Sequence, residues 1–310
     1  MLELAGRTAF ITGGAQGIGL GIARALAREG MRLALADIDT AALADARAEL
    51  STVAEVGTFP LDVRDRAAYA RVTDETEERL GPVSVLCNNA GVGGSTEVAE
   101  MSYELWDLVL GTNLGGVVNG LQTFLPRMMA RGEPGHVVNT ASAAGLAPMG
   151  GATGYLYDAS KAAVIALSEG LGKQLAREGH RIGVTVLCPG PVASNMVATV
   201  RAARAALAVP AACTPQQLAE EERRWAEQAS SLRYLGLPPD TVGSMVVDGI
   251  KANRAYVITD RTMAGPLAVR AKALYEALPA ETEHDRRVSG FIAAQLRQAG
   301  LANGAGPAGL

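Results

Sequence analysis

Cysteine and histidine, the residues of disulfide frameworks and of many metal centres, are scarce in this sequence. Each occurs three times among the 310 residues, at Cys87, Cys188, Cys213, His136, His180 and His284. No two cysteines have C-x-x-C spacing, and the histidines are scattered. The scarcity argues against a disulfide framework and against a bound metal ion, and it is typical of a protein of the reducing cytoplasm.

Long apolar runs and an excess of one charge are missing as well. The sequence has no stretch of about twenty uninterrupted apolar residues, so no membrane-spanning helix is predicted. Glu3, near the N-terminus, does not fit a secretory leader. The formal net charge of −4 provides no attraction to nucleic acid or to an anionic membrane. We therefore expect a small molecule as the partner.

Short apolar stretches alternate with longer helical patterns, and 48% of the residues are hydrophobic. Strands are predicted at 8–12, 32–37, 55–59, 83–88, 136–141, 183–188 and 256–259. Helices are predicted at 18–29, 41–50, 67–80, 103–130, 159–178 and 241–252. Several strands are continuously apolar, as strands covered on both faces are. The alternation predicts an α/β fold, a Rossmann-type doubly wound parallel sheet of seven strands with helices on both faces.

Two segments interrupt this alternation. Residues 195–238 form an insert between the sixth and seventh strands, which we expect to be a helical lid over the substrate, because inserts at the carboxyl ends of strands build substrate sites. The tail has helical patterning around 267–278 and 288–298, followed by a Gly/Ala-rich end. We expect one catalytic domain over residues 1–260 and a C-terminal helical extension over 261–310.

A glycine-rich loop at residues 12–19 leads from the first predicted strand into the first helix. Glycine lets the backbone turn tightly and approach a phosphate, and a helix N-terminus offers free N–H groups and a positive dipole end. The loop predicts a pyrophosphate site made by Gly13, Gln16, Gly17, Ile18 and Gly19. A glycine-rich turn of purely structural use is the alternative.

Asp37 ends the second predicted strand, about twenty residues beyond the glycine loop. A carboxylate there can accept hydrogen bonds from both adenosine ribose hydroxyls and would repel a 2′-phosphate. The next residue, Ile38, is not basic. Asp37 therefore favours NAD over NADP as the cofactor, unless it only caps the following helix, a task that Asp39 can also perform.

Short loops follow the third and fourth predicted strands. They contain Asp62 and Val63 after the third strand, and Asn88, Asn89, Ala90 and Gly91 after the fourth. Because the carboxyl ends of parallel strands meet at one edge of the sheet, these loops are predicted to border the adenine and the cofactor ribose. Asx and Gly are ordinary turn residues, so their position after successive strands is the informative feature.

Tyr157 and Lys161 form a Tyr-x-x-x-Lys pair at the start of a predicted helix. A spacing of four places both side chains on one helix face. A free tyrosine has a pKa of about 10, and a nearby ammonium favours the phenolate. Lowering that pKa to about 7 takes about 4 kcal/mol, to which an oxidised nicotinamide could contribute. The pair is predicted to be the acid/base unit of an alcohol–ketone reaction, a chance surface pair being the alternative.

Two further polar residues fit this chemistry. Ser142 ends the fifth predicted strand and could hold the substrate oxygen near Tyr157. Asn113 lies inside a long helical pattern, where a polar amide needs a partner. Asn113 could bind a water that relays protons from Lys161 to solvent, or it could be a packing residue that is satisfied locally.

Taken in order, these motifs resemble the family of short-chain dehydrogenases/reductases over about residues 5–260. Besides the residues above, the resemblance rests on Pro189-Gly190 after the sixth strand. It implies a catalytic tetrad of Asn113, Ser142, Tyr157 and Lys161, with Lys161 also binding the nicotinamide ribose. It further implies that Pro189, Gly190 and Val192 border the nicotinamide, and that the protein is a homodimer or homotetramer built through the long helices after strands four and five.

The chain departs from the family pattern between the serine and the tyrosine. This segment is longer than usual, so Tyr155 stands at the usual offset from Ser142. Only Tyr157 has a lysine four residues on, and the acid/base role is assigned to it. Ser194 replaces a common threonine. In its insert, its tail and residues 116–131, the chain is similar to the branch that includes the aryl-ether Cα-dehydrogenases of lignin breakdown.

The predicted function is NAD-dependent interconversion of a secondary alcohol and a ketone. The regions expected around the substrate carry few fixed charges, which favours a hydrophobic or aromatic substrate. They contain Leu146, Met149, Tyr155, Met196 and Trp225, each of which could also be ordinary core. Two alternatives stay open: an epimerase or dehydratase that retains its NAD on the same fold, and a non-catalytic nucleotide-binding regulator.

Overall fold

The computed structural model describes residues 3–94, 98, 101–148, 154–206 and 215–298 of the chain. Seven parallel strands form one sheet in the order β3-β2-β1-β4-β5-β6-β7. They are β1 (Thr8–Thr12), β2 (Arg32–Asp37), β3 (Val56–Pro60), β4 (Val83–Asn88), β5 (Gly135–Thr140), β6 (Ile182–Cys188) and β7 (Tyr256–Ile258). The predicted doubly wound parallel sheet is confirmed, and each predicted strand lies within one residue of its observed bounds.

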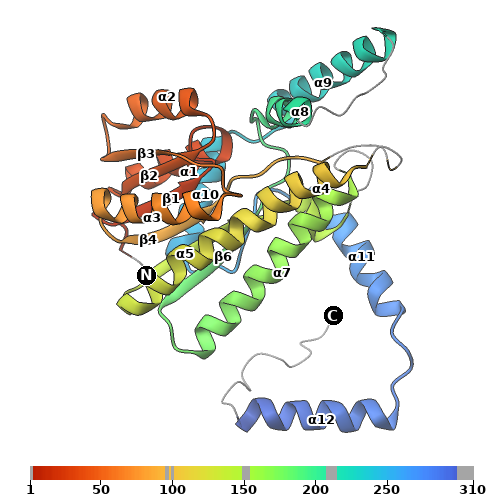
Figure 1. The fold of residues 1–310 in the computed structure, drawn as a ribbon. Helices are drawn as coiled ribbons and strands as arrows, with labels where there is room; N and C mark the ends of the chain where they lie inside the picture. The colour runs from red at the N-terminus through yellow and green to blue at the C-terminus, as the bar shows by residue number, and fades with distance from the viewer. Residues whose placement is uncertain (1–2, 95–97, 99–100, 149–153, 207–214, 299–310) are drawn as a thin grey trace. The chain divides into compact units, whose positions relative to one another are not determined.

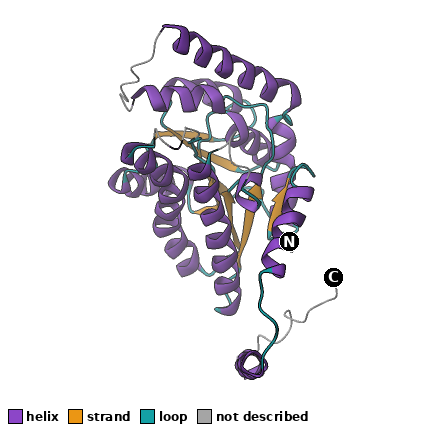
Figure 2. Cartoon of the chain, turned by 90° about the vertical axis from the view of Figure 1, so that its right-hand side faces the viewer, coloured by secondary structure: helices purple, strands orange, loops and turns teal. Residues whose placement is uncertain are grey.

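Helices connect the strands and cover both faces of the sheet (Figures 1 and 2). The helices of the described residues are α1 (Gly17–Arg28), α2 (Thr40–Leu50), α3 (Arg66–Leu80), α4 (Tyr103–Leu110), α5 (Gly116–Arg131), α6 (Ala143–Leu146), α7 (Tyr155–Arg177), α8 (Met196–Ala206), α9 (Pro215–Leu235), α10 (Pro239–Lys251) and, after the last strand, α11 (Ala264–Glu276) and α12 (Glu283–Gln298). Several begin at a side-chain cap, since Asp39, Asp65 and Ser102 each accept a backbone N–H from the first turn of α2, α3 and α4.

Two apolar cores hold the layers together. One face of the sheet packs against α1, α2 and α10, through residues such as Leu26, Leu43 and Val246. The other face packs against α3, α5 and α7, where Phe124 and Val164 are fully buried. Every residue of β1 and β4 is buried, including the few polar ones, as is typical of central strands in a parallel sheet covered on both faces.

The helix predicted over residues 103–130 is wrong in one respect, because it is interrupted. A π-helical turn, Gly111–Gly115, separates α4 from α5. The N–H of Gly116 donates to the carbonyl of Gly111, one residue further back than in an α-helix. Three glycines near the turn loosen the local preference for the α-helix, and Asn113 at its centre bonds outside the helix.

The described structure divides into two compact units, Met1–Ala264 and Gly265–Leu310. The first holds the sheet, its covering helices and the insert. The second contains most of α11 and all of α12, and no residue of α11 is buried. In the first unit the strand order reverses between β1 and β4, so the loops at the carboxyl ends of these strands diverge there. Open α/β sheets bind their ligands at such a point.

Candidate active site

The glycine loop passes from β1 into α1 with a left-handed backbone at two positions, a φ of 61° at Gly13 and of 54° at Gly17. A Cβ on Gly19 would lie 2.0 Å from the carbonyl oxygen of Gly13, so the loop closes only around glycine. Gln16 is the N-cap of α1, yet its side chain makes no capping hydrogen bond, and Ile18 follows in the first turn. The first N–H groups of α1 therefore have no side-chain cap, as a pyrophosphate site requires.

Asp37 reaches from the end of β2 toward this loop. Its Oδ2 accepts the N–H of Ala15 at 3.2 Å, and its Oδ1 accepts the N–H of Asp39 at 3.1 Å. Burial raises the pKa of Asp37, and the backbone hydrogen bonds offset only part of that rise. Asp39, not Asp37, caps α2 through the N–H of Ala42. Helix capping therefore does not explain the carboxylate of Asp37.

The loop after β4 is braced against the glycine loop. The N–H groups of Asn89 and Ala90 donate to Thr12 Oγ1 at 2.9 and 3.0 Å. Asn89 Nδ2 also donates to the carbonyl oxygens of Thr12 and Gly13, at 3.1 and 3.3 Å. The predicted cofactor loops after β1 and β4 are thus one hydrogen-bonded unit.

Asp62 and Val63, after β3, lie at the same edge of the sheet. The Arg64 guanidinium, which bonds Asp62 Oδ2 at 2.7 Å, holds the pKa of Asp62 below its usual range. Val63 is buried, and its carbonyl oxygen accepts Asn119 Nδ2 at 2.8 Å. The side chain of Asp62 is therefore engaged by Arg64, and a border to the adenine at these two residues stays a prediction.

Lys161 is a buried cation on α7. Its Nζ donates to the carbonyl oxygen of Thr140 at 2.8 Å and lies 5.8 Å from the ring centre of Tyr157. A Cβ on Gly91 would lie 3.3 Å from that Nζ, so the loop after β4 also closes over the lysine. Burial lowers the pKa of Lys161 to about 8, which leaves most of the ammonium charged at neutral pH.

Tyr157 lies beside Lys161 and Ser142. It is 8% exposed, whereas Tyr155 is 40% exposed and its ring packs 6.1 Å from that of Trp106. The helix begins at Tyr155, earlier than predicted, so Tyr157 lies in its first turn. Burial raises the pKa of Tyr157, and its hydrogen bond with Ser142 lowers it only in part.

The sign of that shift corrects an expectation. The sequence predicts a lowered pKa for Tyr157 because Lys161 is near. In the ligand-free protein the pKa is raised, since burial deprives the phenolate of its hydration and the charge of Asp158 adds to the rise, while the hydrogen bond with Ser142 offsets only part of it. The protein residues by themselves therefore keep the phenol protonated.

Asn113 occupies the centre of the π-helical turn. Its Oδ1 accepts the N–H of Val92 at 2.8 Å, and its Nδ2 donates to Val92 O at 2.9 Å and to Ser160 Oγ at 3.0 Å. The amide is therefore satisfied by groups outside its own helix, 21 and 47 residues away in the chain. The side chain ties the loop after β4 to α7, and the water relay stays a prediction.

Two residues of the site, Thr140 and Ser160, are not singled out by sequence reasoning. Besides holding Lys161, Thr140 donates through Oγ1 to Asn89 Oδ1 at 3.2 Å. Ser160 Oγ donates to the carbonyl oxygen of Tyr157 at 2.7 Å. Their positions beside Ala141-Ser142 and beside Lys161 are a weak signal. The role of Thr140 depends on a backbone carbonyl, which no motif encodes.

The loop after β6 lies next to the helix that follows Ser142. The carbonyl oxygen of Pro189 accepts the N–H of Ala143 at 2.9 Å, and the N–H of Gly190 donates to Thr259 Oγ1 at 2.9 Å. Val192 is buried and forms an isolated parallel bridge with Leu237. The bridge joins the two ends of the insert.

The insert contains α8 and α9, so its predicted helical character holds for the described residues. Asn195 Nδ2 donates to Gln16 Oε1 at 3.2 Å, which connects the insert to the glycine loop. A Cβ on Gly93 would lie 2.7 Å from Val200 of α8. Of the predicted substrate neighbours, Leu146 ends α6, Met196 begins α8 and Trp225 lies in α9, while Met149 falls outside the described residues.

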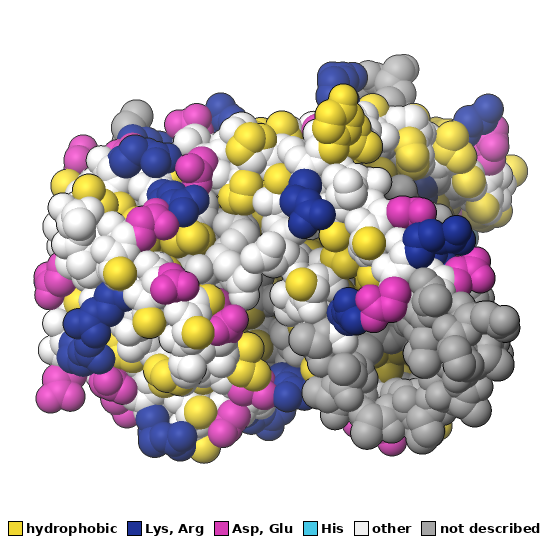
Figure 3. Space-filling model, turned by 90° about the horizontal axis from the view of Figure 1, so that it is seen from above, with side chains coloured by type: hydrophobic (Ala, Val, Ile, Leu, Met, Phe, Trp, Pro, Cys, Tyr) yellow, Lys and Arg dark blue, Asp and Glu magenta, His cyan; other side chains and the backbone are white. Residues whose placement is uncertain are grey.

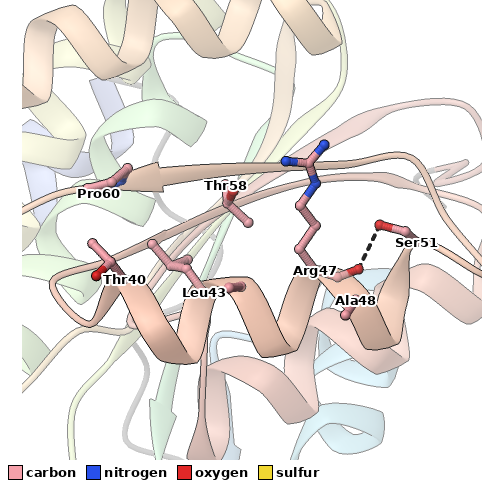
Figure 4. A pocket seen from close by; sticks show the side chains of 8 residues that line it. Thr40, Leu43, Arg47, Ala48, Ser51, Thr58 and Pro60 are labelled. Atoms are coloured by element: carbon pink, nitrogen blue, oxygen red, sulfur yellow. Dashed lines mark hydrogen bonds between the residues drawn. The ribbon is translucent and has the colours of Figure 1, made fainter.

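Two pockets of the described residues lie away from these side chains. A pocket of 360 Å³ between α2 and β3 is lined by Thr40, Arg47, Ser51 and Thr58 among others, and Ser51 Oγ donates to the carbonyl of Arg47 within it (Figure 4). A cavity of 860 Å³ lies at the amino end of β5 and β6. The chemistry of the side chains, rather than the size of a hollow, locates the site.

On the face shown in Figure 3, acidic and basic side chains are interspersed among apolar ones. Within the described residues, no group of three or more His, Cys, Asp and Glu side chains is placed to hold a metal ion. No helix in the described part of the chain is long and apolar enough to cross a membrane.

Comparison with known proteins agrees with this geometry. Residues 7–205 match the family model described as short chain dehydrogenase. The C alpha-dehydrogenase of Sphingobium sp. strain SYK-6 is 36% identical over 260 residues, covering 83% of this chain and 82% of that protein. The probable oxidoreductase EphD of Mycobacterium tuberculosis strain H37Rv is 33% identical over 266 residues, covering 86% of this chain but 41% of that longer protein.

A solved structure is similar over nearly the whole chain. It is a short chain dehydrogenase/reductase from Burkholderia phymatum in complex with NAD, at 33% identity and a TM-score of 0.81, and the match covers 91% of this chain and 99% of that one. The family, the sheet and the order of the motifs therefore agree, and this chain belongs to the short-chain dehydrogenases/reductases, a family of oxidoreductases.

Proposed function

We propose that this protein is an NAD-dependent oxidoreductase that interconverts a secondary alcohol and a ketone, with Tyr157 as the general acid and base. One observation carries the proposal. Ser142, Tyr157 and Lys161 converge at a buried point, at the same edge of the sheet as the glycine loop and Asp37. A hydroxyl, a phenol and an ammonium in this order form a proton-transfer unit beside a nucleotide site.

The residues present fit NAD. The uncapped N-terminus of α1 suits a pyrophosphate, and the carboxylate of Asp37 suits a pair of ribose hydroxyls. Ile38, the next residue, is 69% exposed and offers no partner for a 2′-phosphate. The similar protein from Burkholderia phymatum is in complex with NAD, which supports the same choice. Bound NAD supplies the hydride acceptor in alcohol oxidation and, when reduced, the hydride donor.

The protein residues then donate and accept the proton. In ketone reduction Tyr157 donates its phenolic proton to the substrate oxygen, while Ser142 hydrogen-bonds that oxygen. In alcohol oxidation Tyr157 must accept the proton as a phenolate, although burial raises its pKa. Lys161, whose pKa is about 8, remains largely charged at neutral pH and stabilises that phenolate. The rest of the stabilisation must arise in the complex with oxidised nicotinamide, whose ring is positive.

The substrate is proposed to be hydrophobic or aromatic. Val92, Leu105, Val109 and Leu156 form a buried apolar cluster beside the site, and Trp106 packs on it. The similarity to a C alpha-dehydrogenase supports a dehydrogenase reaction at this site. We propose that the insert, residues 195–238, closes over such a substrate as a lid, since it is anchored through Val192 and touches Gln16. Protection of α8 and α9 from hydrogen exchange should rise when substrate binds, and unchanged protection would reject the lid.

The assembly and location are also proposals. We propose a homodimer or homotetramer built through α5 and α7 in the cytoplasm, on the family resemblance. Sedimentation of the purified protein should give two or four chains. Substituting an exposed apolar residue on α5 or α7 with glutamate should dissociate that assembly, and a monomer in the parent protein would reject it.

A screen of alcohols and ketones with NAD(H) and NADP(H), read at the absorbance of the reduced nicotinamide, tests the function. We expect turnover with a secondary benzylic or alicyclic alcohol and NAD, and its loss in Tyr157→Phe. An epimerase or dehydratase would form product without net reduced cofactor. A nucleotide-binding regulator would bind NAD and turn over none of these substrates. Either result would reject the proposal.

A further inference from the structure

Residues 259–263, directly after β7, contact both loops that flank the proposed nicotinamide site. The hydroxyl of Thr259 accepts the N–H of Gly190 at 2.9 Å and donates to Asp260 Oδ2 at 2.9 Å. Asp260 Oδ1 accepts the N–H and the hydroxyl of Thr262, the first at 2.9 Å. The Asp260 carboxylate therefore orients the Thr259 hydroxyl, and that hydroxyl in turn holds the N–H of Gly190.

The contact is tight enough to restrict the side chain at position 190. A Cβ there would lie 2.1 Å from Asp260 Oδ2, so Gly190 and Asp260 occupy adjoining space that admits no larger residue. Burial alone would raise the pKa of Asp260, but hydrogen bonds from Thr262, Thr259 and the backbone of Gly190 hold that pKa below its usual range. Asp260 is therefore an ionised carboxylate whose two oxygens both accept hydrogen bonds from these partners.

The same segment also touches the helix that follows Ser142. Met263 is 5% exposed and forms a small apolar cluster with Ala143 and Ala147. The N–H of Ala143 donates to the carbonyl of Pro189 at 2.9 Å. The loop of Gly190 and the start of α6 are thus joined directly to each other and, through residues 259–263, to the end of the sheet.

We propose that residues 259–263 form a clamp that positions Gly190 and its loop against the nicotinamide half of the cofactor, with Thr259 and Asp260 as positioning residues. The inference rests on the proposed function, because only a cofactor with a nicotinamide gives this loop a ligand to position. The clamp acts on one half of NAD. Its loss should leave the adenosine and pyrophosphate contacts at Asp37 and α1 intact.

Thr259→Val tests the clamp, because valine has nearly the shape of threonine but cannot accept the N–H of Gly190. The probes are NAD and ADP-ribose, which shares the adenosine and pyrophosphate but lacks the nicotinamide. Titration calorimetry should show NAD binding weakened about fivefold to tenfold in Thr259→Val, as an unpaired buried N–H group predicts, with ADP-ribose binding changed less than about twofold. Thr259→Ser, which keeps the hydroxyl, should restore NAD binding.

A matched control separates positioning from stability. Thr185→Val removes another buried hydroxyl, on β6, that bonds His136 and Arg254 away from the proposed cofactor site. It should lower thermal stability without changing the ratio of the two affinities. If Thr259→Val is poorly folded, Asp260→Asn offers a milder break with the same selective loss.

The outcomes distinguish a failure of the clamp from a failure of the proposed function on which it rests. Equal weakening of NAD and ADP-ribose in Thr259→Val, or no weakening, overturns the clamp. A parent protein that binds neither probe overturns the proposed function and the clamp with it. A parent protein that binds NAD but oxidises no alcohol overturns the proposed reaction, while the ratio of affinities still decides the clamp.

Discussion

Both ends of the parallel sheet bury an ionisable side chain, and the same loss of hydration has different results there. At the carboxyl end, burial lowers the pKa of Lys161 to about 8, and a charged ammonium persists at neutral pH. At the amino end, burial lowers the pKa of His136 to about 4, so its imidazole is neutral. His136 Nε2 lies 2.8 Å from Thr185 Oγ1, whose hydrogen goes to the Arg254 carbonyl at 2.6 Å.

The contrast between the two buried groups indicates which end of the sheet carries the chemistry. At the amino end a neutral ring bonds a hydroxyl, and the ring lines an 860 Å³ pocket whose charged side chains, such as Glu169 and Lys173, remain at least partly exposed to water. At the carboxyl end a buried cation is kept beside a phenol at a cost in hydration. A protein retains a buried charge where function needs it, so changes at the carboxyl end should remove activity and changes at the amino end should remove stability.

The largest expected effect is that of Tyr157→Phe at the carboxyl end. Loss of the proton-transfer hydroxyl should lower kcat by about 10²- to 10⁴-fold. NAD affinity and the free energy of unfolding should change little, because the ring remains in place. The matched control is Tyr155→Phe, whose hydroxyl lies two residues away on a more exposed ring. Comparable losses in the two variants, measured as kcat with a saturating alcohol, would show that the wrong tyrosine was chosen.

Lys161→Ala should have the next largest effect, and the effect should appear in how the two reaction rates depend on pH. With saturating NAD, alcohol oxidation should rise with pH as Tyr157 ionises and then level, while ketone reduction falls over the same range. Removing the ammonium withdraws a positive charge that favours the phenolate, so both inflections should move upward and kcat at neutral pH should fall about a hundredfold.

NAD binding should also weaken in Lys161→Ala, if the ammonium holds the ribose. Titration of the phenol by its ultraviolet absorbance in the ligand-free protein should show ionisation above the usual tyrosine range, as burial requires. An unchanged pH profile with most activity retained would remove Lys161 from the acid/base unit.

Asp37→Ala should change cofactor choice and not chemistry. Loss of the ribose-binding carboxylate should reduce the preference in kcat/KM for NAD over NADP by about tenfold to a hundredfold, and Ile38→Arg in the same chain should extend the shift. Asp39→Ala is the control, since it removes the cap of α2 and should cost about 1 kcal/mol of stability without changing the preference. A parent enzyme that prefers NADP would contradict the role of Asp37.

The smallest effect on activity is expected at the amino end, where His136 couples stability to pH. Its folded pKa of about 4 lies below the ordinary value of 6.5, so the unfolded chain binds the proton more readily. Stability is therefore complete above about pH 6.5 and should fall by about 2–3 kcal/mol as the pH drops toward 4. Denaturant unfolding across this range measures it.

His136→Gln should flatten that dependence while kcat at neutral pH changes less than about twofold, since the site at the other end is untouched. A steep fall of kcat in His136→Gln with unchanged stability would reverse the comparison between the two ends of the sheet.

The fold was predictable where local pattern and burial agree. Most strands are short, largely apolar and buried, and the bounds of all seven could be read to within one residue. The interruption of the helix predicted over 103–130 could not, because the π-helical turn centres on Asn113, whose amide bonds Val92 across 21 residues. Helical periodicity describes one helix by itself and contains no information about such a partner.

The candidate site likewise has local features that the sequence predicts and long-range contacts that it does not. The glycine loop and the Tyr-x-x-x-Lys pair are local, because a strand, a turn and the spacing along one helix determine their geometry. The Thr140 carbonyl, the Asn89 brace and the contact of Gly190 with Thr259 join segments that are far apart in sequence, in the last case by 69 residues. Spacing along one helix or strand cannot predict contacts between such distant segments.

Residue type and short spacing were enough to indicate the family, the fold class and the side chains that can carry the chemistry. The folded structure was needed to show that Tyr157 is buried while Tyr155 is more exposed, and that the pKa of Tyr157 is raised in the ligand-free protein. Only it showed that Asp39 caps α2 and that Thr259 holds Gly190. Hydration and long-range hydrogen bonds control these properties, and both exist only once the chain has folded.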